Sequence, residues 1–308
     1  MLANAILLLD KPPDITSFGA IARVRRILGV KKAGHTGTLD PMATGVLPIL
    51  LGGATRFADY LPGKDKAYIA SFQLGVVTDT LDCTGNVIET HPVDVGIDDV
   101  KAALERFDGK ITQTPPMYSA ISKNGVRLYA LARQGITIER DPRSVEITRI
   151  ALTKAHGEHE YTIDVHCSAG TYIRSLIDDL GRALGCGACM TALRRTVANG
   201  FAIARCASLE QLQSLPQDDL TKMGALMPID DALDDYPKIA VTQAQAKRFL
   251  NGGGLDLNRL TLNQALARSA YCRVYDPEFV FLGLGRFSGG ELAVARILPN
   301  EWRQHGTD

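Results

Sequence analysis

The sequence lacks the features that mark several common classes of protein. It contains no run of about 18 apolar residues, which is roughly the length that a membrane-spanning helix requires. No basic segment precedes the apolar residues 5–9, so a secretory signal peptide is not expected either. Walker A, GxGxxG, GxSxG and HExxH motifs are all missing, and with them the usual markers of nucleotide-binding, esterase and zinc-protease sites. We therefore predict a cytoplasmic protein without a membrane partner.

Metal-binding patterns are also missing. The six cysteines include one close pair, Cys186 and Cys189, but no second CxxC and no HxxxH accompany it. A structural zinc site needs four ligands, and a redox CxxC would be expected within a thioredoxin-like pattern that this sequence does not show. We expect free thiols in the core and predict neither a metal site nor a cofactor.

The chain has no excess of charge of either sign, with 34 Lys and Arg residues against 34 Asp and Glu residues. Their distribution is uneven. Residues 1–66 contain nine basic and five acidic residues, whereas residues 205–235 contain seven acidic and two basic ones. A cationic flank of this kind presents a local field to a polyanion, and we expect the acidic segment to face away from it. The alternative is scattered, solvated charge.

At 308 residues, 45% of them apolar, the chain has the length of roughly two domains. The segment from Pro216 to Pro237 is acidic and rich in turn-forming residues, and short β-strand patterns follow it. We predict one domain over residues 1–235 and a smaller, mainly β domain over residues 236–308. No heptads, low-complexity segments or internal repeats are apparent.

Residues 33–48 form the most unusual segment of the chain. Glycine, proline and hydroxyl residues dominate it, with neither helical nor strand periodicity, so a loop is predicted. It carries His35 and Asp40, and Pro41 biases Asp40 toward an extended conformation. Its glycines permit positive φ angles or the close approach of another backbone. These residues predict a carboxylate held in place, with an ordinary connection and a solvated Asp as the alternative.

A basic helix is predicted just before this loop. Thr16 or Ser17 can cap its start, and Gly29 ends it. Arg25 lies near its end and Lys31 follows at once, so positive charge leads directly into the loop. A cationic last turn also suits the helix dipole, which is the structural explanation for these residues.

Two later segments place further polar side chains. Residues 66–74 alternate as a strand that carries Tyr68 on its apolar face. Thr171 is the predicted cap of a later helix, and it would place Tyr172 and Arg174 in the first turn. In isolation, Tyr172 would be a core-edge residue and Arg174 a surface charge. An arginine beside an aspartate favours the ionised carboxylate, which acts as a nucleophile or charge stabiliser without a cofactor.

Seven blocks of the sequence, in consecutive order, resemble the signature motifs of the TruB family of pseudouridine synthases. They are residues 8–12 (LLDKP), 33–41 (AGHTGTLDP), 65–68 (DKAY), 78–82 (TDTLD), 116–120 (PMYSA), 170–181 (GTYIRSLIDDLG) and 193–195 (LRR). The blocks cover about the first two-thirds of the chain. The last seventy or so residues resemble the PUA-type RNA-binding module only in their position and strand pattern.

The resemblance implies an α+β fold with a mixed, largely antiparallel central sheet flanked by helices, and a small, mainly β PUA-like domain after it. It also implies isomerisation of the uridine at position 55, in the TΨC loop of tRNA, to pseudouridine. The target nucleotide would be flipped out of its stack, and no cofactor would take part. tRNA is then the expected partner of a monomer that needs no other protein.

Residue roles follow from the same resemblance. The catalytic aspartate falls on Asp40, its aromatic partner and candidate proton acceptor on Tyr68, and the active-site arginine that pairs with the aspartate on Arg174. His35 would fill the gap left by the flipped nucleotide, and Tyr172 and Leu193 would pack the pocket. The remaining residues expected to bind substrate are Lys11, Asp82, Arg25 and Lys31, with Arg194 and Arg195 also placed near phosphates.

Two other functions are compatible with parts of this pattern. A non-catalytic RNA-binding or RNA-folding protein would use the same basic surface, although intact Asp40 and Arg174 argue against it. A glycoside hydrolase would need a second catalytic acid near Asp40, and Asp82 is the only weak candidate.

Overall fold

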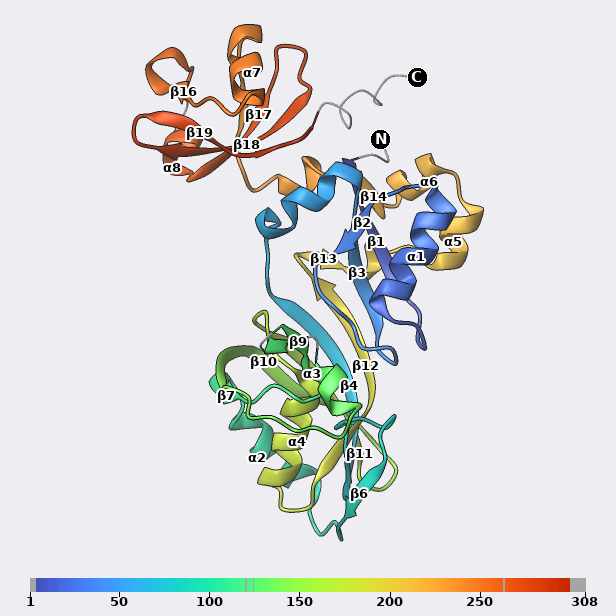
Figure 1. Cartoon of the computed structure of the whole chain (residues 1–308). Coiled ribbons are helices and arrows are strands. Elements are labelled where there is room, and N and C mark those ends of the chain that lie inside the picture. The colour runs from blue at the N-terminus through green and yellow to red at the C-terminus, as the bar shows by residue number, and fades with distance from the viewer. Residues whose placement is uncertain (1–3, 120, 124, 263, 300–308) are drawn as a thin grey trace.

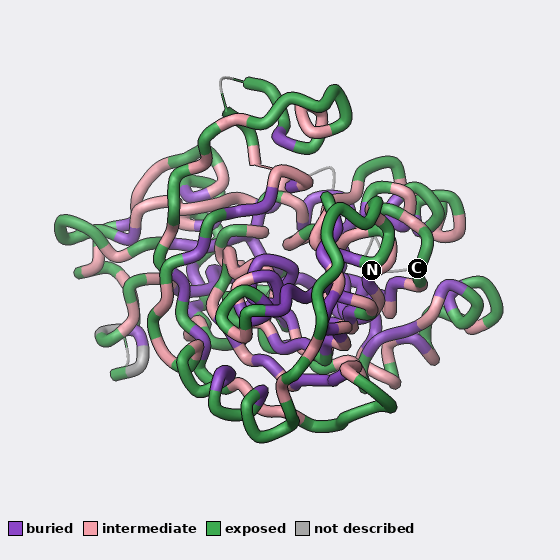
Figure 2. The backbone as a smooth tube through the Cα atoms, turned by 90° about the horizontal axis from the view of Figure 1, so that it is seen from below, coloured by how far each residue is buried: buried purple, intermediate pink, exposed green. Residues whose placement is uncertain are grey.

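The computed structural model of the protein describes residues 4–119, 121–123, 125–262 and 264–299. Ala120, the last residue of the 116–120 block, lies outside the described residues. A long sheet organises the N-terminal part of the chain, and a smaller sheet lies at one end of it (Figure 1). Buried residues gather in the interior, and most exposed residues lie in peripheral loops and helix surfaces (Figure 2).

The large sheet has ten strands in the described part of the chain, and its main path runs β14-β1-β3-β12-β4-β11-β10-β7. In addition, β2 pairs with β3 and β13 pairs with β12. Only the β3–β12 pair is parallel among the described pairs of this sheet. The predicted mixed, largely antiparallel α+β fold is thereby confirmed. Its strands are β1 (Ala5–Lys11), β2 (Ala33–His35), β3 (Thr44–Leu51), β4 (Lys66–Leu74), β7 (Gly109–Gln113), β10 (Arg143–His156), β11 (Glu160–Cys167), β12 (Ala188–Ala198), β13 (Phe201–Ala202) and β14 (Leu226–Pro228).

Helices cover one face of this sheet and share a core with it. α4 packs against β12 and β4, α2 against β10, and α5 against both β1 and α1. Side chains such as Leu9, Tyr68 and Phe72 from the sheet meet Val24 and Leu176 from the helices in one buried cluster. The helices are α1 (Ser17–Leu28), α2 (Ile97–Glu105), α3 (Leu128–Ala132), α4 (Ile173–Ala183), α5 (Leu209–Ser214), α6 (Gln217–Lys222), α7 (Gln243–Leu250) and α8 (Gln264–Arg268), with 3₁₀ turns η2 (Gly52–Tyr60), η3 (Ile203–Arg205), η4 (Asp231–Leu233) and η5 (Leu257–Arg259).

The small C-terminal sheet has the order β15-β17-β18-β19-β16. Phe281 and Leu284, on its middle strand, join Phe57 in a second buried cluster, so the small sheet is attached to the rest of the chain by apolar packing. The acidic linker before it is fixed, because the Arg273 guanidinium donates hydrogen bonds to the carbonyls of residues 230, 234 and 236. The boundary at residue 235 stays a prediction. The strands are β15 (Lys238–Ala240), β16 (Leu255–Asp256), β17 (Tyr271–Tyr275), β18 (Phe281–Ser288) and β19 (Glu291–Ile297), and two separate ribbons pair β5 (Val76–Thr78) with β6 (Val87–Thr90) and β8 (Ser122–Lys123) with β9 (Val126–Arg127).

Local sequence signals placed several elements correctly. α1 begins after Thr16, whose side chain accepts a hydrogen bond from the amide of Gly19, and ends at Gly29 with a φ of 67°. Residues 66–74 form β4 as predicted, and Tyr68 lies on its buried face. No helix in the described ranges is both long and apolar enough to span a bilayer.

Other local predictions were wrong. The segment 33–48 is not a loop throughout, because residues 33–35 form β2 and residues 44–48 belong to β3. β2 pairs with residues 49–51 of β3, just beyond the segment. Thr171 does not cap α4, since its hydroxyl donates to the carbonyl of Ser168 and Tyr172 occupies the N-cap position. One expectation stays a prediction: α5, from the acidic segment, packs against the basic α1, and this packing does not test whether the acidic residues face away from RNA.

Candidate active site

The loop between β2 and β3 carries Asp40 and is fixed by buried polar side chains from three elements. Ser17, at the start of α1, exchanges hydrogen bonds with both the amide and the carbonyl of Leu39. Lys11, at the end of β1, donates to the carbonyls of Pro12, Ile15 and Pro41. Since backbone groups on both sides of Asp40 are held in this way, the predicted fixed position of the carboxylate has a physical basis.

Arg195 provides the third anchor. Its guanidinium donates to the carbonyls of Gly37, Thr38 and Val46, and only 1% of the residue is exposed. The backbone of Arg195 also approaches Gly45, where an added Cβ would lie 2.1 Å from the Arg195 carbonyl oxygen. Gly45 also has a φ of 103°. Glycine is therefore required there both by the backbone conformation and by the lack of space for a side chain. The prediction that Arg195 meets RNA phosphates is wrong, because its charged end is enclosed by protein carbonyls.

Arg174 pairs with Asp40 across the fold. Its Nε lies 2.9 Å from an Asp40 carboxylate oxygen, and Nη1 lies 3.5 Å from Asp82. The remaining donors reach the carbonyls of Thr80 and Tyr118. The arginine side chain is almost wholly buried, whereas one-third of the Asp40 side chain is exposed. The predicted pair therefore exists, and the carboxylate is the partner that faces the cavity.

Asp82 occupies a structural position beside this pair. It is buried, and its Oδ1 accepts hydrogen bonds from the Thr80 hydroxyl and from the amide and hydroxyl of Thr84. Because Oδ1 is committed to this turn and Oδ2 faces Arg174, Asp82 is poorly placed to act as the general acid of a glycosidase. Asp82 is buried but borders a second cavity together with Asp40 and Arg174. Its predicted substrate-binding role stays a prediction, and its contact with Arg174 also orients that side chain.

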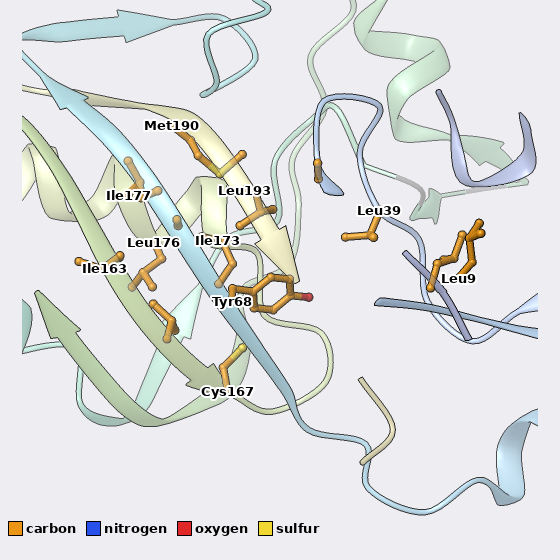
Figure 3. Packing of buried hydrophobic residues seen from close by; sticks show 14 of the residues in the cluster. Leu9, Leu39, Tyr68, Ile163, Cys167, Ile173, Leu176, Ile177, Met190 and Leu193 are labelled. Carbon is orange, nitrogen blue, oxygen red and sulfur yellow. The ribbon is translucent and has the colours of Figure 1, made fainter. Parts of the chain in front are cut away.

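A cavity of about 230 Å³ opens beside Asp40. Tyr68, Tyr172, Ile173 and Leu193 supply much of its wall. The ring of Tyr68 projects from β4 toward the segment that carries Leu39, with its oxygen foremost (Figure 3). Gln113 fixes the backbone of Tyr172 through hydrogen bonds to its amide and carbonyl. The cavity is smaller than the roughly 300–1,000 Å³ usual for ligand sites, as suits one aromatic base.

Burial changes the protonation of the two central groups. It raises the pKa of Asp40 above its usual range, although the nearby Arg174 guanidinium opposes the shift. Arg174 thus favours the ionised carboxylate, as expected, while burial acts in the opposite direction and is the larger effect. Burial also raises the pKa of Tyr68, with Arg195 opposing it. A phenol with a raised pKa stays protonated at neutral pH and is a weak proton acceptor.

His35 lies at the end of β2, near the exposed aromatic residue Phe18. The two rings meet edge to face with their centroids 5.6 Å apart. Burial lowers the pKa of His35, so its imidazole is neutral at pH 7, and Nδ1 makes no hydrogen bond with any described residue. Sequence reasoning missed Phe18, which is 75% exposed. The available signal was that this large apolar side chain does not lie on the buried face of α1.

The other predicted cationic residues divide into two groups. Lys11 is fully buried, burial lowers its pKa to about 8, and its ammonium faces protein carbonyls, so it holds the Asp40 loop. Arg25 and Lys31 are exposed on and after α1, outside the cavity wall. Arg194 forms an ion pair with Asp10 at 2.7 Å and is partly exposed. Only this second group has charge available to a phosphate.

Lys66 and Ser119 are among the cavity-wall residues that sequence reasoning did not assign to the site. Lys66 precedes Tyr68 by two residues on the same strand, so strand alternation already placed both side chains on one face. The Ser119 hydroxyl is buried and has no hydrogen-bond partner in the described part of the protein. No local signal distinguished Ser119 from other loop serines.

The raised pKa of Asp40 leads to a testable pH dependence. If the ionised carboxylate is the reactive form, activity is present above the folded-state pKa and falls as the pH decreases through it. We expect the acidic limb of kcat/KM for RNA modification to have its midpoint above the ordinary Asp value of about 3.9. Rates measured between about pH 4 and 8, with RNA affinity measured in parallel, test this. A rate that stays constant down to about pH 4 would contradict the assignment.

The large mixed sheet, together with a carboxylate–guanidinium pair formed by the β2–β3 loop and the start of α4, defines a pseudouridine synthase fold. The solved structure described as "Crystal Structure of a Cbf5-Nop10-Gar1 Complex" matches with a TM-score of 0.71 and 26% identity, over 98% of this chain and 87% of that chain. A second, described as "Structure of H/ACA RNP bound to a substrate RNA containing 2'-deoxyuridine", matches with a TM-score of 0.70 and 25% identity, over 98% and 87% of the two chains.

Sequence comparisons identify the family. Residues 25–173 match "TruB family pseudouridylate synthase (N terminal domain)", residues 174–234 match "tRNA pseudouridylate synthase B C-terminal domain", and residues 237–298 match "Pseudouridine synthase II TruB, C-terminal". The tRNA pseudouridine synthase B of Burkholderia pseudomallei is 43% identical, over 96% of this chain and 97% of its own. That of Pseudomonas syringae is 42% identical, over 97% and 96%. The chain belongs to the TruB family of pseudouridylate synthases.

Proposed function

We propose that this protein isomerises the uridine at position 55, in the TΨC loop of tRNA, to pseudouridine. The observation that carries this proposal is the Asp40–Arg174 pair on the wall of a cavity that also contains the Tyr68 ring. An ionised carboxylate supported by a buried guanidinium supplies a nucleophile or charge stabiliser. The aromatic wall supplies a stacking surface for a uracil that has left the RNA stack.

The reaction exchanges one glycosidic bond for another. The bond between C1′ and N1 breaks, the uracil turns within the cavity, and C1′ bonds to C5. C5 then loses its proton and N1 gains one, so the atoms balance without a co-reactant. Asp40 takes part by attack on the sugar or base, or by assisting departure of the uracil. Because the pKa of Tyr68 is raised by burial, we assign Tyr68 to base stacking in preference to proton transfer.

The direct test is to map pseudouridine in tRNA treated with the protein. We expect one new pseudouridine, in the TΨC loop of an unmodified tRNA transcript, without any added metal or cofactor. A transcript with cytidine at that position serves as the control and should gain none. Modification only at other positions, or none at all, would contradict the proposal.

The exposed basic residues around α1 predict a salt-dependent contact with RNA. Replacing Arg25 and Lys31 by glutamate should weaken tRNA binding and reduce the slope of log affinity against log salt by about one to two. The matched control replaces two exposed cations, Lys101 on α2 and Arg106 at its C-cap, by glutamate. Unchanged affinity and slope in the Arg25 and Lys31 variant would place the RNA elsewhere.

We further propose that the protein acts on tRNA as a monomer in the cytoplasm, without another protein. The described chain itself supplies the carboxylate, the guanidinium and the aromatic wall of the cavity. Sedimentation of the protein with and without tRNA would test this, since a dimer formed at working concentrations would contradict it.

A further inference from the structure

Four cations surround the Asp40 cavity and its loop, and three of them are fully engaged by the protein. Arg174 binds two carboxylates and two carbonyls. Lys11 and Arg195 each donate to three carbonyls. The fourth, Lys66, lines the cavity, and among the described residues it has neither an ion-pair partner nor a hydrogen-bond acceptor.

The surroundings of Lys66 make an ammonium without a partner energetically unfavourable. The Lys66 Nζ and an Arg195 Nη1 both lie close to Gly37, at 3.7 Å and 3.6 Å from the position that a Cβ would take there. Burial lowers the pKa of Lys66, and the neighbouring Arg195 lowers it further. A partly buried ammonium beside a second cation is stabilised by an anion that comes from outside the protein.

The position of Lys66 indicates which anion this is. Lys66 lies two residues before Tyr68 on β4, so the two side chains share one face about 7 Å apart. If Tyr68 stacks on the flipped uracil and Asp40 faces its sugar, a phosphate of the same nucleotide falls at the edge of the cavity. Nearby Gly37 has no side chain to obstruct the approach of an RNA backbone.

We propose that the Lys66 ammonium binds a phosphate next to the target uridine and thereby holds the flipped nucleotide over Asp40. This inference rests on the proposed function for the identity of the RNA. It assigns Lys66 a substrate-positioning contact, distinct from the salt-dependent surface around α1. Since the contact forms only after flipping, it selects the reactive conformation of the nucleotide.

Binding measurements test this contact independently of the chemistry. The protein carries Asp40→Asn, so that the RNA is not converted, and is combined with Lys66→Gln. The probe is a TΨC stem-loop, either natural or with one neutral methylphosphonate on the 5′ or 3′ side of the target uridine. With Lys66 present, one of the two methylphosphonates should weaken binding about tenfold or more. With Lys66→Gln, natural RNA should bind about as weakly, and the methylphosphonate should have little further effect.

Two further variants keep the result interpretable. Lys66→Arg retains the charge and should retain most of the phosphate dependence, which separates a charge contact from a packing role. Lys64→Gln removes an exposed cation from the same segment and should leave the methylphosphonate effect intact. The proposal would be overturned if the loss of affinity caused by Lys66→Gln added in full to the loss caused by each methylphosphonate. It would also be overturned if Lys66→Gln left the affinity unchanged. Failure of the proposed function is separate, since it would appear as absent pseudouridine in tRNA treated with the unmodified protein.

Discussion

Asp40→Asn is expected to abolish pseudouridine formation while leaving the protein folded. An amide is uncharged and a poor nucleophile, so the rate should fall by about 10⁴-fold or more, the scale on which loss of a single nucleophile acts. The side chains of Asn and Asp are nearly equal in size, and Arg174 keeps Asp82 as an ionic partner. Single-turnover modification of a tRNA transcript gives the measurement.

The free energy of unfolding of Asp40→Asn provides an independent check, because the direction of its change follows from the pKa of Asp40. The folded-state pKa of Asp40 is raised, so the folded protein binds protons more readily than the unfolded chain at this site. Ionised Asp40 therefore makes folding less favourable as the pH rises through its folded-state pKa. Asp40→Asn should be at least as stable as the unmodified protein at pH 7, as measured by urea unfolding. A loss of stability that parallels the loss of rate would contradict the catalytic assignment.

Asp59→Asn is the matched control for Asp40→Asn, because it removes a carboxylate that lies outside the site. Asp59 is exposed in η2 and does not line the cavity, so Asp59→Asn should leave the modification rate nearly unchanged. The same pair of variants distinguishes catalysis from RNA folding. If Asp40→Asn still promotes refolding of misfolded tRNA at the normal rate, the two activities coexist and only one depends on the carboxylate.

The sequence was most informative where the chemistry is local. Thr16 and Gly29 marked the ends of α1, alternation placed Tyr68 on a buried face, and Pro41 indicated a restrained Asp40. Each of these features depends on neighbours within a few residues. The pairing of Asp40 with Arg174 spans more than 130 positions, and only the ordered blocks of the family resemblance predicted it.

The two adjacent arginines of β12 show where local reasoning ends. Neighbouring residues of a strand point to opposite faces, so alternation implies that Arg194 and Arg195 have different environments. It does not say which of them is inside. The answer depends on β3, which pairs with β12 in parallel and brings the carbonyl of Val46 to the Arg195 guanidinium. Lys11 is similar, because its buried position follows from the path of the Asp40 loop above it.

Arg174→Met should cause the largest loss of stability among single changes at this site. The side chain is 6% exposed and separates two carboxylates, Asp40 and Asp82. Removing one partner of a buried ion pair costs about 3–5 kcal/mol, because the remaining charge is left without compensation. The loss should appear in urea or thermal unfolding at pH 7, together with loss of modification activity.

The pH dependence of that variant tests the mechanism of the loss. The Arg174 guanidinium opposes the raised pKa of Asp40, so without it the Asp40 carboxylate becomes easier to protonate in the folded state. Lowering the pH from 7 toward 5 should therefore recover part of the stability. Combining Arg174→Met with Asp40→Asn removes one of the two unpaired charges, and this double variant should recover part of the lost stability at pH 7.

Arg182 provides the matched control for Arg174 on the same helix. It forms an ion pair of 3.0 Å with Asp178, but its side chain is 71% exposed. Asp178 is the buried partner, with 10% of its side chain exposed, while the Arg182 guanidinium stays in solvent and weakens the pair. Arg182→Met should therefore destabilise the protein less than Arg174→Met. Equal losses from the two variants would mean that α4 as a whole is sensitive to this substitution. A large loss confined to Arg174→Met would show that the buried contacts to Asp40 and Asp82 join the loop, the 78–82 turn and α4 into one site.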